Sequence, residues 1–446
     1  MTWRRYASLP ILWLYLGPPI LRPVSERGAM ESLAGVFDAW NIFRLAWWML
    51  FALIALVSIY QHRQHVREFI RTMPQLVLWV FVWVSSLIVS SAFSPAPLFT
   101  LANAGLMLML VVAGFDLGLR IFARTVDLET VLRGLYVVSV GLLAMIVVNI
   151  FLDPGSLLGV RGLGFRIGGG FIGDTALLAS VVIFLSLYFL MRVRGSKAVW
   201  YAIATIASLA ILVMTRTRTA YIGLALGGGL FAFQWLLLVA PRARAIALGA
   251  ILIAAGLVPP AIVAADALTG TSSINQMAQY LVRDATTVAT ASGRTTITAI
   301  VIEQVASQPW GLGYSAGPRL LLQSSYSELG EHGVHAERIG NAHNTFLEML
   351  GGSGVLGLFA YLAFLTWVAL NMLRVSDRGM LPVRALFIYV VVAGLTSSNG
   401  VLPFFQASVL TWFVLGAVAG ANGVLHAMPS RAPRAVPRPP ALEMVR

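Results

Sequence analysis

Long runs of apolar residues, separated by short polar segments, make up most of the chain. About 20 apolar residues are needed to cross the hydrocarbon core of a bilayer, and the pattern predicts twelve such helices. Their predicted ranges are 8–24, 41–60, 75–93, 98–119, 132–152, 172–191, 198–214, 220–240, 245–265, 343–370, 383–398 and 401–425. Prolines interrupt the first run, but no cleavage site of small residues follows it, so we expect a retained helix. The predicted fold class is an all-α polytopic membrane protein with about 12 transmembrane helices.

The composition agrees with a membrane protein. Hydrophobic residues make up 58% of the chain, charged residues 11%, and the mean hydropathy is +0.82. These values are not those of a soluble globular protein. The sequence has no cysteine, which excludes disulfides and thiolate chemistry. A net charge of +13 is typical of proteins that bind nucleic acid, but its distribution along the chain indicates a different origin.

Basic residues alternate between the predicted loops. With the N-terminus in the cytoplasm, every inner loop has at least two, whereas the outer loops 94–97 and 399–403 have none. This is the positive-inside pattern of a polytopic protein with both termini in the cytoplasm. It accounts for most of the basic charge, so we expect no nucleic acid partner. Acidic residues balance the arginines on the outer side, so an anion there would need a local cluster of arginines.

One long polar stretch, residues 266–342, lies on the outer side between the ninth and tenth predicted spans. Apolar residues at helical spacing within it predict a helix that begins near Ser292 and ends before Pro309. We treat residues 1–426 as a single transmembrane domain into which this loop is inserted. The basic, proline-rich tail, 427–446, is expected to be disordered in the cytoplasm, where it can contact anionic membrane lipids.

Five arginines fall near the outer ends of predicted helices: Arg161, Arg166, Arg216, Arg218 and Arg294. Arg216 and Arg218 lie in a gap of five residues, 215–219, that contains no acid. A guanidinium group stays charged and presents two parallel donors to phosphate oxygens, so the set favours a diphosphate ligand. A simpler interpretation is that each arginine reaches lipid headgroups or pairs with an acid such as Asp153 or Asp174.

His343 begins the tenth predicted span at the outer boundary, and Glu348 follows about one turn later. Histidine is well suited to accept a proton near neutral pH, which makes His343 a candidate general base. A capping or interfacial histidine would fit the same position. His332 and His335 could hold a metal together with a nearby carboxylate, but their loose spacing in a glycine-containing loop favours a protein without a metal site.

Three motifs occur in order between residues 160 and 360. Residues 217–220, TRTA, open a predicted span; 292–294, SGR, precede 308–313, QPWGLG; and 343–344, HN, precede 354–357, GVLG. Together they resemble the motifs of the O-antigen ligase and polymerase superfamily of bacterial envelopes. The resemblance implies a helical membrane fold and a donor polysaccharide carried on undecaprenyl diphosphate.

The resemblance also implies roles for particular residues. His343, Arg218 and Arg294 match positions implicated in catalysis or donor binding. Arg161 and Arg166 lie where the match is less sharp, and Arg216 joins the predicted diphosphate-binding set through its place beside Arg218. The predicted enzyme needs no metal, nucleotide or other cofactor, because the sugar–diphosphate bond supplies the free energy of transfer. Direct attack would invert the anomeric centre.

Within the superfamily, the single large outer loop and the short basic C-terminus favour an O-antigen ligase. Such an enzyme joins O-antigen to lipid A–core at the periplasmic face of the inner membrane, in lipopolysaccharide biosynthesis. An O-antigen polymerase and a protein O-oligosaccharyltransferase are the alternatives within the superfamily. A transporter of lipid-linked glycans is the alternative of another class, and the scarcity of charge in the middle of the predicted spans disfavours it.

Overall fold

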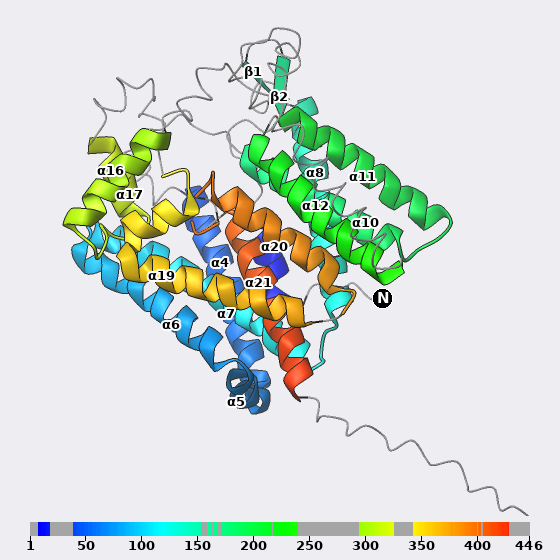
Figure 1. Cartoon of the computed structure of the whole chain (residues 1–446), viewed down its shortest axis with the longest axis horizontal. Helices are drawn as coiled ribbons and strands as arrows, with labels where there is room; N and C mark the ends of the chain where they lie inside the picture. Colours follow the sequence, from blue (N-terminus) through cyan, green and yellow to red (C-terminus); the bar gives the residue numbers. More distant parts are fainter. Residues whose placement is uncertain are drawn as a thin grey trace, which may run out of the picture.

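The computed structural model describes residues 8–17, 39–152, 158–161, 164–167, 172–215, 217–239, 294–324, 342–375, 377–398, 400–402 and 405–427. These residues form a bundle of α-helices with one two-stranded hairpin at one end (Figure 1). The all-helical membrane class predicted from the apolar runs is therefore observed, except for the hairpin. Its strands lie in a glycine-rich segment, 153–171, where hydrophobic periodicity gives no signal.

The bounds of the longer helices follow the apolar runs closely. They are α4 (Ala39–Gln61), α6 (Pro74–Val89), α7 (Pro97–Phe122), α8 (Leu128–Leu152), α10 (Ile172–Leu190), α11 (Ser196–Thr215), α12 (Arg218–Val239), α19 (Thr345–Arg374), α20 (Met380–Gly394) and α21 (Gln406–Ala427). The shorter elements are α2 (Pro10–Leu16), α5 (Arg63–Thr72), the 3-10 helix η2 (Ser90–Phe93), β1 (Leu158–Arg161), β2 (Gly164–Ile167), α16 (Arg294–Ser307) and α17 (Ala316–Ser324). The helix predicted near Ser292 is present as α16.

Seven of the described helices are long and apolar enough to cross a membrane, or up to eight if α4 and α5 count as one bent span. The protein is therefore a multi-pass membrane protein, but the predicted number of twelve is not confirmed. Helices α10 and α20 are apolar but shorter than the other spans. The predicted span 245–265 lies outside the described residues.

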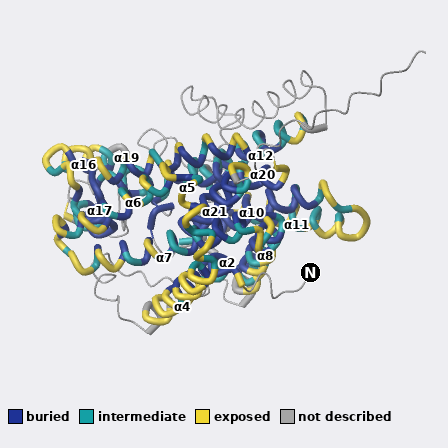
Figure 2. The backbone as a smooth tube through the Cα atoms, turned by 90° about the horizontal axis from the view of Figure 1, so that it is seen from below, coloured by how far each residue is buried: buried dark blue, intermediate teal, exposed yellow. Residues whose placement is uncertain are grey.

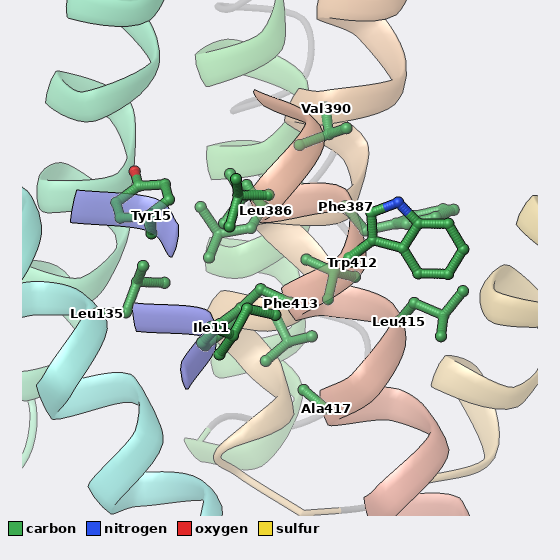
Figure 3. Close-up of a cluster of buried hydrophobic side chains, with 14 of the residues drawn as sticks. Ile11, Tyr15, Leu135, Leu386, Phe387, Val390, Trp412, Phe413, Leu415 and Ala417 are labelled. Atoms are coloured by element: carbon green, nitrogen blue, oxygen red, sulfur yellow. The ribbon is translucent and has the colours of Figure 1, made fainter. Parts of the chain in front are cut away.

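The first predicted span, 8–24, contains a described helix of only 7 residues, α2. At about 1.5 Å per residue this helix is far too short to cross a bilayer. Its side chains are buried: Ile11 and Tyr15 are each 1% exposed and lie among residues of α8, α20 and α21, including Leu135 and Phe413 (Figure 3). The described part of this apolar run therefore fills the interior of the bundle.

Helix α21 forms the centre of the bundle, whereas α4 is largely exposed (Figure 2). Helix α21 packs most closely on α7, and their backbones nearly touch. A Cβ atom added at Gly416 would lie 2.4 Å from the carbonyl oxygen of Gly114. Small residues at such crossings let helices approach within van der Waals contact, which is a major source of helix association in membranes.

Candidate functional site

His343 lies in the turn that directly precedes α19. Its backbone is left-handed, with φ 51°, and the residue is half-buried. The next residue, Asn344, caps the helix: its side-chain oxygen accepts hydrogen bonds from the main-chain N–H groups of Phe346 at 2.8 Å and Leu347 at 3.2 Å. Asparagine is a preferred cap because it satisfies N–H groups that have no partner within the helix. The helix thus starts two residues later than predicted, with His343 outside its first turn.

The segment that follows α20, residues 395–398, holds this turn in place. The side-chain amide of Asn344 donates to the carbonyl oxygen of Leu395 at 3.0 Å, and its main-chain N–H donates to the Ser398 hydroxyl at 3.2 Å. The Thr345 hydroxyl donates to the carbonyl oxygen of Ser397 at 2.8 Å. These contacts fix the backbone on the C-terminal side of His343.

The same segment contacts the start of α12. The hydroxyl groups of Thr219 and Thr396 share a hydrogen bond of 2.5 Å. Arg218, the first residue of α12, directly precedes Thr219. The residues that follow Arg218 and His343 therefore both contact residues 395–398, although they are far apart in the sequence.

Glu348 supports the turn from the other side. It is fully buried, and its Oε2 atom accepts a hydrogen bond at 2.9 Å from the main-chain N–H of Ala342, the residue before His343. Ser398 lies beside the same carboxylate. Among the described residues, its second oxygen, Oε1, has no hydrogen-bond partner.

Arg319 of α17 supplies positive charge near Glu348. Burial lowers the pKa of Arg319, and the Glu348 carboxylate opposes this shift. The guanidinium carbon lies 5.6 Å from the centre of the Phe99 ring, within the range of a cation–π contact. Arginine keeps its proton in such an environment, so the half-buried Arg319 supplies a positive charge whose field acts on the carboxylate behind His343.

A loop before α17, residues 309–313, packs backbone to backbone against a break in α19. Helix α19 is interrupted at Gly354, where φ is 72° and ψ −171°, a conformation essentially limited to glycine. Three main-chain hydrogen bonds join the loop to the break: Leu312 to Gly351 at 2.9 Å, Gly313 to Gly352 at 2.9 Å, and Val355 to Pro309 at 3.0 Å. A Cβ atom at Gly354 would lie 2.3 Å from the carbonyl oxygen of Pro309. Only a residue without a side chain fits here.

Tyr314 anchors the end of this loop. Its side chain is fully buried, its main-chain N–H donates to the Ser90 hydroxyl at 3.0 Å, and its phenol donates to the carbonyl oxygen of Val401. Burial raises the pKa of Tyr314 well above its usual value, so the phenol remains a neutral donor. The loop is thereby joined to η2 and to the connection between α20 and α21.

Four of the five predicted arginines, all except Arg216, lie in described elements: the hairpin, α12 and α16 (Figure 1). Arg294 begins α16, which packs on α17 and α19 through a small apolar cluster that includes Ile297 and Leu322. Arg161 and Arg166 occupy β1 and β2, where the register pairs them with Gly164 and Gly159. Residues opposite each other and two apart share one face of a strand pair, so both positions belong to the same face of the hairpin. Arg216 and the side chains of the other four lie outside the described part.

Residues 203–362 match the family model described as O-antigen ligase. This match supports membership of the chain in the O-antigen ligase and polymerase superfamily. A comparison with curated proteins finds no match. Members of the superfamily are enzymes of the glycosyltransferase type that act on lipid-linked glycans, and this coarse function extends to the chain.

The superfamily match extends from α11 into α19 and contains Arg216, Arg218, Arg294 and His343. Arg161 and Arg166 precede it. Two of the motifs in the matched region form one structural unit, since residues 309–313 bind the break at Gly354. Their glycines therefore have a structural role: they allow the close backbone contact that positions the first turns of α19.

Sequence reasoning missed the contribution of residues 395–398. Thr396, Ser397 and Ser398 are polar residues at the outer end of a predicted span, and this local polarity was the one signal of their role. It missed Arg319 as well, because the charge pairing with Glu348 depends on the packing of α17 against α19. Among the described residues, no group of three histidine, aspartate or glutamate side chains could hold a metal ion. His332 and His335 lie outside the described residues.

Proposed function

We propose that the protein is an O-antigen ligase, which transfers polysaccharide from undecaprenyl diphosphate to a sugar hydroxyl of lipid A–core. The observation that carries the proposal is that Asn344, which follows His343, and Thr219, which follows Arg218, both form hydrogen bonds with residues 395–398. The general base must contact the acceptor hydroxyl that attacks C1, and the diphosphate-binding group must contact the leaving diphosphate on the other side of C1. A shared supporting segment would keep these two groups near the same sugar. We further propose that residues 1–426 form one catalytic domain in the inner membrane, with the site at the periplasmic face and both termini in the cytoplasm.

In the proposed reaction, His343 accepts the proton of the acceptor hydroxyl. The hydroxyl oxygen forms a bond to C1 of the donor sugar while the bond from C1 to the diphosphate breaks, and undecaprenyl diphosphate leaves with the electron pair. The anomeric centre is inverted. A positioned general base contributes about 10²–10⁴-fold to the rate. The left-handed backbone of His343, held on both sides by hydrogen bonds, supports this role because strained residues persist mainly where function needs them.

The arginines would bind the diphosphate and stabilise the charge that develops as it leaves. Arg218 and Arg294 are the first residues of α12 and α16. Helix N-termini favour anions because their main-chain N–H groups and dipoles point toward the ligand. Arg216, Arg161 and Arg166 complete the proposed set. Preorganised donors of this kind contribute about 3–4 kcal/mol each where they have been removed singly from other enzymes.

Glu348 would act as a positioning residue and would not touch the substrate. Its carboxylate fixes Ala342, and the Ser398 hydroxyl fixes Asn344, the other neighbour of His343. Errors of 1 Å in the position of a catalytic group can reduce a rate by about 10²-fold. The two contacts therefore support a defined orientation of the imidazole toward an acceptor hydroxyl.

The proposal is tested by transfer in vitro with the purified protein, in the presence of EDTA. Donor polysaccharide on undecaprenyl diphosphate is offered with lipid A–core, with free repeat units, or with an acceptor protein. Glycosylated lipid A–core, formed without a metal or an ion gradient, is the expected product. Elongated repeat units would identify a polymerase, and modified protein would identify a protein O-oligosaccharyltransferase. The absence of any covalent product would favour a transporter.

A further inference from the structure

A groove lies where helices α4 and α5 (labelled in Figure 1) meet at an angle of 91°. It has a volume of about 750 Å³. Helix α4 contributes apolar and aromatic side chains, Leu56, Ile59 and Tyr60. Helix α5 contributes Val66, Ile70 and three arginines, Arg63, Arg67 and Arg71.

The side of α5 opposite its arginines packs against the helix bundle, so the arginine side is left to line the groove. Phe69 is 1% exposed and packs on the rings of Phe115 and Phe122, with centroid distances of 5.1 Å and 5.4 Å. This aromatic contact fixes α5 across the end of α7. The bend between α4 and α5 is therefore part of the folded structure, and the arginine face of α5 points away from the protein interior.

The three arginines form a continuous positive stripe. They recur every four residues, so they share one side of α5, and all three are exposed. Glu68 is the one acid of α5, yet among the described residues none of the three forms an ion pair with it or with another carboxylate. The Arg63 guanidinium carbon lies 4.7 Å from the centre of the Tyr60 ring, which orients it over the groove. The stripe thus has positive charge that the described protein groups do not neutralise.

An apolar surface leads from this stripe along α4. Leu53, Leu56 and Val57 are 58%, 50% and 49% exposed, and Tyr60 is 66% exposed (Figure 2). In a membrane-crossing helix, this surface faces hydrocarbon. The groove therefore combines a cationic end at the level of headgroups with an apolar wall that continues into the bilayer.

We propose that this groove binds an anionic glycerophospholipid. Its phosphate would contact Arg63, Arg67 and Arg71, and one acyl chain would lie along α4. Charge complementarity favours a lipid with net negative charge, because a zwitterionic headgroup brings its own cation to the stripe. The continuous apolar wall favours a lipid over a soluble anion. The positive-inside pattern places this end in the cytoplasmic leaflet, where juxtamembrane basic residues attract anionic lipids.

Native mass spectrometry of the full chain in a nonionic detergent tests the proposal. The protein is mixed with phosphatidylglycerol or phosphatidylcholine of identical acyl chains, with and without inorganic phosphate. Adducts of phosphatidylglycerol should exceed those of phosphatidylcholine. The triple substitution Arg63→Gln, Arg67→Gln and Arg71→Gln should remove most of this preference, because each arginine contributes about fivefold in affinity.

A matched control removes the same charge elsewhere on the predicted cytoplasmic side. Arg194→Gln, Lys197→Gln and Arg378→Gln change three exposed basic residues outside the groove and should leave the preference unchanged. The single substitution Arg67→Gln, with an expected loss of about fivefold, replaces the triple variant if that variant does not fold. Equal losses in the control and groove variants would overturn the proposal. So would equal binding of the two lipids, or displacement of phosphatidylglycerol by inorganic phosphate.

Discussion

The carboxylate of Glu348 accepts a hydrogen bond at 2.9 Å from the main-chain N–H of Ala342, so a buried acid within α19 fixes the turn that carries His343. The contact reaches back across the beginning of the helix. It links the candidate base to Arg319 through the charge of the same carboxylate. The orientation of the turn that carries the imidazole therefore depends on a buried acid of α19.

Substitution of Glu348 should separate positioning from catalysis. Glu348→Ala leaves the N–H of Ala342 buried without an acceptor, which costs about 1–3 kcal/mol. We expect a lower unfolding temperature and a fall in kcat. Glu348→Gln keeps an acceptor oxygen and should restore part of both quantities, as measured by thermal unfolding and by transfer kinetics. Equal kcat values for Glu348→Ala and the unmodified protein would contradict the positioning role.

Substitution of His343 should separate the backbone requirement from the imidazole. A non-glycine residue in the left-handed region costs about 1–2 kcal/mol, and asparagine tolerates this region better than alanine. We therefore expect His343→Asn and His343→Gly to unfold at higher temperatures than His343→Ala. All three should lose transfer activity by about 10²-fold or more. Full activity in the well-folded His343→Asn variant would remove the proposed base.

Arg218 should be sensitive to the shape of its side chain as well as to its charge. Lysine retains the positive charge but cannot bind phosphate oxygens with two parallel donors. Arg218→Lys should therefore lower kcat/KM for transfer by about 10-fold or more, as one lost charge-assisted hydrogen bond contributes about 1.5–3 kcal/mol. Arg194→Lys, at an exposed position on the opposite predicted side, is the control and should leave transfer unchanged. Unchanged kinetics in Arg218→Lys would count against clamping of a diphosphate.

The break in α19 should tolerate no side chain at Gly354. Gly354→Ala places a Cβ atom 2.3 Å from the carbonyl oxygen of Pro309 and imposes a backbone conformation that costs about 1–3 kcal/mol. The unfolding temperature and transfer activity should both fall. Gly141→Ala, within α8, meets nothing within 4 Å and should be neutral or slightly stabilising, since alanine is the better helix former. A Gly354→Ala variant as stable as Gly141→Ala would show that the loop contact is not required.

Hydrophobic runs were sufficient to predict the class of the protein and the extents of most helices. The helical spacing of Ile297 and Ile300 predicted α16, and both residues are buried as expected. Length alone did not reveal that the described part of the run 8–24, α2, is mostly buried, because an apolar run that fills a protein interior has the same composition as one that faces lipid. The right-angled bend before Arg63 was missed for a related reason: α4 and α5 differ in polarity, but no proline or glycine marks the junction.

The sequence could suggest individual candidate site residues, but it could not suggest how they are arranged. His343 was identified from its residue type and its place at the start of a span. Its supports, Glu348 and Ser398, make hydrogen bonds whose partners only the folded chain brings together. A close backbone contact, such as that at Gly354, is indicated in the sequence only by a glycine. Because glycine also occurs in turns, caps and bulges, the contact could not be predicted from it. The convergence of the arginine side chains remains a prediction.

The main-chain hydrogen bonds between residues 309–313 and the break in α19 have a mechanical consequence. Helices α16 and α17 cannot move independently of α19, because the loop between them, residues 309–313, is hydrogen-bonded to the break in that helix. A movement of α16 and α17, when a glycan arrives or a product departs, would therefore be transmitted through α19 to the imidazole of His343. Displacement of α16 and α17 and misalignment of the His343 imidazole would then occur together.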